Sequence, residues 1–124
     1  MEVKMKHLNH IDKCRFLNEI YNYESNPDKF TYIGKTPSMV IFASPCSKFC
    51  VELEPALEIM AKRRRERYKV YYVDTDLEPE MSRNFVGRRV PVIYICPIGA
   101  APTIVSETIN VRDLFNLADR LLTK

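Results

Sequence analysis

The sequence contains no tryptophan, only three glycines and two histidines, and no long apolar run. So few glycines leave no glycine-rich loop that could hold a phosphate group. No segment approaches the about 20 apolar residues that a membrane-spanning helix needs. The first residues also lack an apolar segment of signal-peptide length. We therefore expect no membrane contact and no export signal. The sequence does not exclude a mature form from which a signal has been removed.

Cysteine and charge are also limited, and both narrow the class of protein. The four cysteines (Cys14, Cys46, Cys50 and Cys96) are too few for a secreted module of 124 residues held together by disulfides. A reducing, cytoplasmic location is the expectation. The formal charge of +3 is mildly basic and predicts no nucleic-acid partner. With 46% hydrophobic residues, we expect a single globular domain over residues 1–124.

Hydrophobic patterning predicts alternating helices and strands. Continuous apolar runs of strand length are typical of strands that are covered on both faces, and 3.6-residue periodicity predicts the helices. The expected elements are helix 10–23, loop 24–37, strand 38–44, helix 47–65, strand 68–76, helix 79–87, strand 90–96, edge strand 102–108 and helix 111–124. This order predicts an α/β protein with a mixed sheet of four or five strands and helices on both faces.

Two of the cysteines fall within apolar patterns. Cys14 shares a predicted helical stripe with Ile11 and Leu17, and Cys96 ends the predicted strand 90–96. We expect both to be inert core side chains.

Charged clusters are expected to be structural. The basic run 62–69 is typical of a solvated helix end, where cations stabilise the negative end of the dipole. The acidic residues Asp74, Asp76, Glu78 and Glu80 suit a turn and a helix start better than a metal site.

The segment FASPCSKFCVELEP, residues 42–55, raises the functional question, because two thiols stand where a strand passes into a helix. MVIFAS precedes the cysteines, and Pro55 follows Cys50 by five residues. DTDLEP and FVGRRVPVIYI come later, with Pro91 forty-one residues after Cys50. In this set of features the chain resembles the thioredoxin family, in which a central strand precedes the cysteines. The resemblance extends from about Phe16 to Leu122 and implies a thioredoxin fold.

The resemblance has clear departures. In a gapless comparison Cys50 takes the place of the family's second, resolving cysteine, and Ser47 takes that of the attacking one. Cys46 falls one residue earlier, where the family has tryptophan. The family's buried aspartate corresponds to Ile41, and the lysine that pairs with it corresponds to Tyr72. Loss of a positioned acid–base group predicts slow resolution of mixed disulfides.

The two thiols can nevertheless work together. Residues four apart on a helix have Cα atoms about 6 Å apart, within the range for a disulfide. Cys46 would attack a substrate disulfide, and Cys50 would resolve the mixed disulfide. The positive end of the helix dipole and the cation of Lys48 favour the thiolate form of Cys46.

The resemblance also implies a substrate-binding surface. Pro91 would have a cis peptide bond and face the cysteines, and the backbone of Val90 would pair with an extended substrate peptide. We expect Pro45, Ser47 and Lys48 to complete this surface around the thiols.

The leading hypothesis is therefore a thioredoxin-like thiol–disulfide oxidoreductase with reduced activity. It would bind no cofactor and no metal. Its partners would be disulfide-containing or thiol proteins, with a thioredoxin reductase or a small thiol as electron donor. The main alternative is a redox-inactive module that binds proteins through the groove beside Pro91. Two idle thiols, a metal or cluster site, and a single working Cys50 with Ser47 beside it are further alternatives.

Overall fold

The computed structural model describes residues 7–87, 89–106 and 110–123. Its strands are β1 (Asn9–His10), β2 (Ser38–Ala43), β3 (Lys69–Asp74), β4 (Val92–Cys96) and β5 (Thr103–Ser106). Its helices are α1 (Lys13–Glu19), α2 (Lys48–Arg63), α3 (Pro79–Phe85) and α4 (Val111–Leu122). The segments between β2 and α4 fall within the ranges that the hydrophobic pattern predicts.

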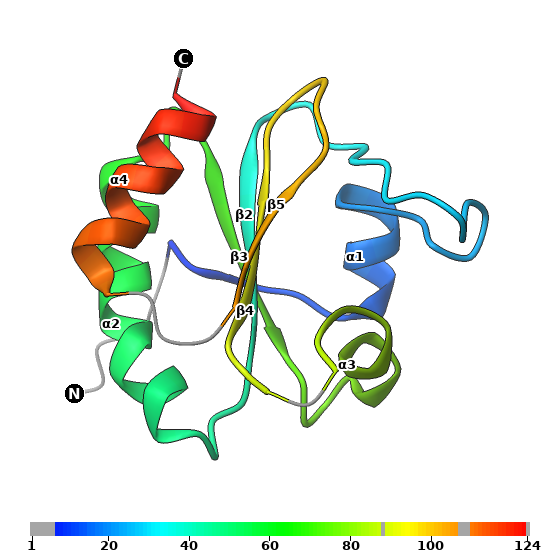
Figure 1. Cartoon of the computed structure of the whole chain (residues 1–124), viewed down its shortest axis with the longest axis horizontal. Coiled ribbons are helices and arrows are strands. Elements are labelled where there is room, and N and C mark those ends of the chain that lie inside the picture. Colours follow the sequence, from blue (N-terminus) through cyan, green and yellow to red (C-terminus); the bar gives the residue numbers. More distant parts are fainter. Residues whose placement is uncertain (1–6, 88, 107–109, 124) are drawn as a thin grey trace.

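The five strands form one mixed sheet with the order β1-β3-β2-β4-β5. β1, β3 and β2 run parallel, whereas β4 is antiparallel to both β2 and β5. Figure 1 shows the sheet nearly edge-on, with α2 and α4 on one face and α1 and α3 on the other. The predicted α/β fold, a mixed sheet with helices on both faces, is confirmed.

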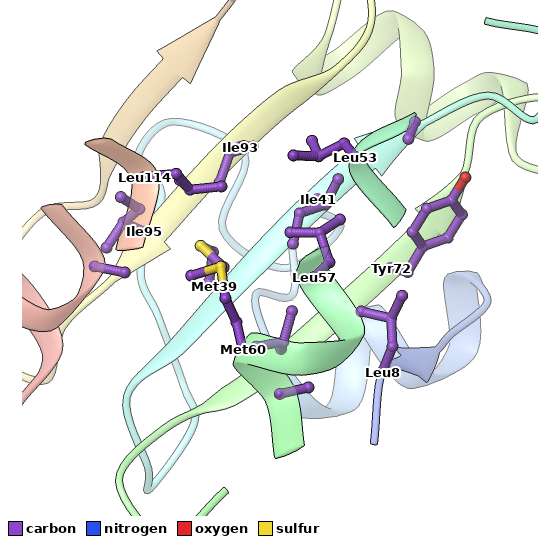
Figure 2. Packing of buried hydrophobic residues seen from close by; sticks show 14 of the residues in the cluster. Leu8, Met39, Ile41, Leu53, Leu57, Met60, Tyr72, Ile93, Ile95 and Leu114 are labelled. Carbon is purple, nitrogen blue, oxygen red and sulfur yellow. The ribbon is translucent and has the colours of Figure 1, made fainter. Parts of the chain in front are cut away.

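β2 is the centre of the core, and all six of its residues are buried. Because side chains alternate along a strand, Met39, Ile41 and Ala43 face α2 and α4, while Val40 and Phe42 face the other side. Figure 2 shows the first of these faces, where leucines of α2 pack over Ile41 and Met39.

The opposite face is rich in aromatic rings. Phe42 stacks on Phe85 of α3 with ring centroids 5.5 Å apart, and Phe16 of α1 lies 5.1 Å from the same ring. The ring of Tyr94 meets that of Phe42 edge-on at 5.5 Å. Aromatic pairs of this kind contribute about 0.5–1.5 kcal/mol each beyond the area that they bury.

The amino-terminal region differs from its prediction. The first helix is shorter than expected, because Asp12 caps it by accepting a hydrogen bond from the backbone N–H of Arg15 at 2.9 Å. The residues before it form β1, a strand too short to produce an alternating pattern.

The expectation for Cys14 was wrong, since its side chain is exposed. The helix turns Phe16 and Ile20, which are four residues apart, toward the core, and Cys14 lies on another face. The expectation for Cys96 is confirmed, because its side chain is fully buried on β4.

The basic run 62–69 contains one specific contact besides the solvated helix end. Lys62 and Arg63 lie in the last turn of α2 as predicted. Arg64, which follows them, donates two hydrogen bonds of 2.9 Å to the carboxylate of Asp119 on α4. This pair connects the two helices that cover one face of the sheet. No helix among the residues described is long and apolar enough to cross a membrane.

Candidate functional site

The site lies where three chain segments meet at one end of the sheet. In the β2–β3 pair, Ala43 lies opposite Asp74, and in the β2–β4 pair, Phe42 lies opposite Val92. Because β4 is antiparallel to β2, the residues that follow β2 and those that precede β4 lie at the same end of the sheet. Figure 1 shows the segment from β2 to α2 and the segment that leads into β4 in the lower part of the view.

Ser44, which follows the last residue of β2, fixes the turn that carries Cys46. The hydroxyl of Ser44 accepts a hydrogen bond from the backbone N–H of Cys46 at 3.1 Å and donates one to Asp76 at 2.8 Å. The backbone N–H of Ser47 donates to the carbonyl of Ser44 at 3.1 Å. These bonds connect the turn to the end of β3 and set the direction in which α2 begins.

The two thiols of the motif differ in exposure. Cys46 is exposed in this turn, whereas Cys50 lies in the first turn of α2 and is 1% exposed. Cys50 packs in the same apolar cluster as Ala43 and Leu53. Both thiols are free. One thiol is therefore accessible to a large molecule from the turn before α2, and the other lies beneath the surface in the first turn of the helix.

The residues before β4 complete this end of the sheet. The Val90–Pro91 peptide bond is cis, and Pro91 is buried. Val90 is half-buried and packs against the cluster that contains Cys50. An exposed apolar ring, that of Phe49 at 58% exposure, lies beside the thiols at the start of α2.

The predicted substrate-facing residues differ in their surroundings. Pro45 and Lys48 are exposed on either side of Cys46 and Ser47. Ser47 is half-buried and is the N-cap of α2, but its side chain makes no capping hydrogen bond. Its hydroxyl is therefore not committed to the helix end.

Comparison with known proteins agrees with this arrangement. No known protein-family profile matches the chain. The sequence is similar to the thioredoxin of Borreliella burgdorferi, with 25% identity over 89 residues, which make up 72% of this chain and 75% of that protein. The strand order, the helices on both faces and this similarity agree. The chain has the thioredoxin fold.

Within this thioredoxin fold, the buried floor beneath the thiols lacks an ion pair. Ile41 of β2 and Tyr72 of β3 are register partners and are 0% and 4% exposed. Burial raises the pKa of Tyr72, and the negative charge of Glu54 raises it further, so the phenol stays protonated. No carboxylate stands at Ile41 to accept a proton from Cys50.

The sequence pattern missed several polar neighbours of the site. The Ser44–Asp76 hydrogen bond joins segments 32 residues apart, and no local pattern indicates such a pair. His10, which the predicted helix 10–23 includes, lies instead on β1 opposite Tyr72. Its imidazole Nε2 is 3.8 Å from Glu54 Oε1 on α2.

The acidic residues after β3 have structural partners. Asp74 accepts a hydrogen bond from the backbone N–H of Asp76 at 2.8 Å, and Glu80 lies 2.9 Å from the ammonium of Lys13. Across the portions of the chain that the structure covers, no group of three or more His, Cys, Asp or Glu side chains is arranged to hold a metal ion.

Proposed function

We propose that this protein is a thioredoxin-like thiol–disulfide oxidoreductase with Cys46 and Cys50 as its redox pair. The observation that carries the proposal is an exposed thiol in the turn before α2 and a buried thiol in the first turn of that helix, at the end of the sheet that also holds Val90 and Pro91. An accessible thiol suits attack on a substrate, and a shielded thiol suits the second, internal step.

The reaction would proceed in two exchanges. The Cys46 thiolate attacks one sulfur of a substrate disulfide, which forms a mixed disulfide and releases the first substrate thiolate. The Cys50 thiolate then attacks the Cys46 sulfur, which forms the Cys46–Cys50 disulfide and releases the second substrate thiolate. The substrate gains two electrons and the protein loses two. A thioredoxin reductase or a small thiol would reduce the protein again.

The substrate would be an extended peptide that carries a disulfide. Val90 would pair with its backbone by strand addition, with Pro91 preventing a competing bond because proline has no backbone N–H. Pro45, Ser47 and Lys48 would border the peptide around the attacking sulfur. We expect this substrate to be a protein in a reducing, cytoplasmic compartment, because four cysteines are too few for a secreted module held together by disulfides.

Insulin reduction by dithiothreitol tests the proposal. The wild type should accelerate the reaction, and Cys46→Ser should abolish the acceleration. Cys14→Ser is a matched control, because it removes another exposed thiol that lies on α1, and it should retain the wild-type rate. If the wild type gives no acceleration, or if Cys46→Ser retains it, the proposal is wrong.

A redox-inactive binding module is the second candidate, and one observation favours it. The pair Ile41 and Tyr72, at the centre of the sheet, supplies no carboxylate for proton transfer. Mass spectrometry of alkylated protein across a glutathione redox series separates the two functions. A pair of motif thiols that exchanges at physiological potentials supports the enzyme, whereas thiols that stay reduced throughout support the binding module.

A further inference from the structure

A half-buried carboxylate lies one helical turn after the buried thiol. Glu54 follows Cys50 by four residues on α2, so their Cβ atoms are about 6 Å apart on one face of the helix. Helical side chains lean toward the amino-terminal end, and the Glu54 side chain therefore leans back toward Cys50. Its side chain is 26% exposed, which leaves it a path to solvent.

His10 and Tyr72 enclose this carboxylate from the sheet. Their rings lie 4.6 Å apart and their residues are register partners in the β1–β3 pair. His10 Nε2 lies 3.8 Å from Glu54 Oε1. In Figure 2 the hydroxyl of Tyr72 points toward the end of the sheet on which Leu53 lies. Cys50 and Tyr72 belong to the same buried cluster, and the negative charge of Glu54 helps to raise the pKa of Tyr72.

Other charged groups also surround His10 and Tyr72. Asp12, Arg15, Asp74 and Glu78 line a pocket with them. Asp74, which ends β3, and Asp76, which follows it, act on the Tyr72 phenol more weakly than Glu54 does. α2 contributes Glu58 one turn further along. β2 and β4 present apolar side chains to this face, with Ile41 and Ile93 in the same cluster.

Glu58 differs from Glu54 because it is committed to the fold. It accepts hydrogen bonds from the backbone N–H groups of His7 at 2.8 Å and Leu8 at 2.9 Å, and from the His7 side chain at 3.2 Å. Burial opposes its ionisation, but these bonds outweigh burial and lower the pKa of Glu58. Glu58 therefore holds the residues that lead into β1, the strand of His10. Glu52, which is exposed two residues after Cys50, offers a control with the same chemistry on the same helix.

We propose that Glu54, oriented by His10, is the proton acceptor for Cys50. It would accept the proton that the apolar side chain of Ile41 cannot accept. The inference rests on the proposed function, because it concerns the second exchange of that reaction. The Cys50 thiol gives its proton to the Glu54 carboxylate, and the thiolate so formed attacks the Cys46 sulfur. The bond between Cys46 and the substrate breaks, and the substrate sulfur leaves as a thiolate. The proton leaves Glu54 for water, directly or through His10.

The aromatic disulfide dithiobis(nitrobenzoate) tests this step, because each exchange releases one coloured thionitrobenzoate. The Cys14→Ser background removes the other exposed thiol. Attack by Cys46 releases the first equivalent, and ring closure by Cys50 releases the second. Stopped-flow absorbance reads the two rates separately, and urea denaturation checks that each variant is folded.

Glu54→Gln should slow the second release by about tenfold or more and leave the first unchanged, because only the second step needs the base. Glu52→Gln, at an exposed position on the same helix, should leave both rates unchanged. Glu54→Asp, which keeps a shorter carboxylate, should give an intermediate second rate and provides the test if the Gln variant does not fold.

The outcomes distinguish the two proposals. A second release that is equally fast in Glu54→Gln, Glu54→Asp and the wild type would overturn the role of Glu54 and leave the proposed function standing. Equal slowing in Glu54→Gln and Glu52→Gln would also overturn it, because the effect would then not depend on the carboxylate beside His10. A wild type that releases only one equivalent would overturn both, since Cys50 would not close the ring.

Discussion

Replacing Ser44 with alanine should destabilise the protein through the turn that carries Cys46. The hydroxyl of Ser44 is part of a residue only 7% exposed and makes two hydrogen bonds, one from the Cys46 backbone N–H and one to the Asp76 carboxylate. A neutral hydrogen bond contributes about 0.5–1.5 kcal/mol, and one to a charged group about 1.5–3 kcal/mol. Asp76 and Cys46 are both exposed, so water replaces part of what is lost. We expect the free energy of unfolding to fall by about 1–2 kcal/mol.

Ser47→Ala is the matched control for this prediction. Ser47 lies three residues later and its side chain makes no capping hydrogen bond, so its loss should change the free energy of unfolding by less than about 0.5 kcal/mol. Urea denaturation of the reduced proteins, followed by far-ultraviolet circular dichroism, measures both values. Equal effects of the two substitutions, or no effect of Ser44→Ala, would refute the argument that the Ser44 hydroxyl holds the turn.

Three further predictions concern the rest of the fold. Arg64 holds the pKa of Asp119 below its ordinary value. The pair therefore stabilises the folded state fully above the unfolded pKa near 4, and this stabilisation is lost as pH falls through the lower folded pKa. Asp119→Asn should remove this acid dependence and lower the free energy of unfolding by about 1 kcal/mol at neutral pH, as measured by urea denaturation at pH 3–7. Leu57→Ala should lower the free energy of unfolding by about 2–5 kcal/mol, because Leu57 is 1% exposed. Leu77→Ala, at a residue 74% exposed, should lower it by less than about 0.5 kcal/mol. Similar losses for the two variants in thermal unfolding would contradict the burial of Leu57 in the core. Burial raises the pKa of Cys96 to about 12. Iodoacetamide should therefore leave Cys96 unmodified in the native protein and modify it in urea. Rapid labelling of Cys96 in the native protein, as detected by mass spectrometry, would refute its burial.

The sequence was most informative where local pattern and tertiary structure agree. β2 is a continuous apolar run because both of its faces are covered, and α4 begins at Asn110, whose side chain accepts a hydrogen bond from the Asp113 backbone N–H. The turn after α3 was marked by Gly87, whose φ of 80° favours glycine. In these places a residue's chemistry is enough to fix the local conformation.

The sequence was least informative where a contact joins distant segments. Cys14 lies in an apolar-looking stretch, but the orientation of α1 depends on Phe16 and Phe85 meeting across the sheet face. β1 has only two residues and is defined by its pairing with β3. The same reason hid the neighbours of Cys50. His10 and Glu54 are 44 positions apart in the chain and become neighbours only when β1 joins the sheet.

Pro55 divides α2 into two unequal parts. Proline carries no amide hydrogen, so the helical bond from position 55 to the carbonyl of Val51 cannot form. The turn that holds Cys50 is therefore joined to the remainder of the helix by one bond fewer, while Arg64 fastens the other end to α4. Backbone amides should accordingly exchange with deuterium faster in the part of α2 before the proline than in the part after it. The buried thiol could then move toward Cys46 while the core beneath residues 57–61 stays closed.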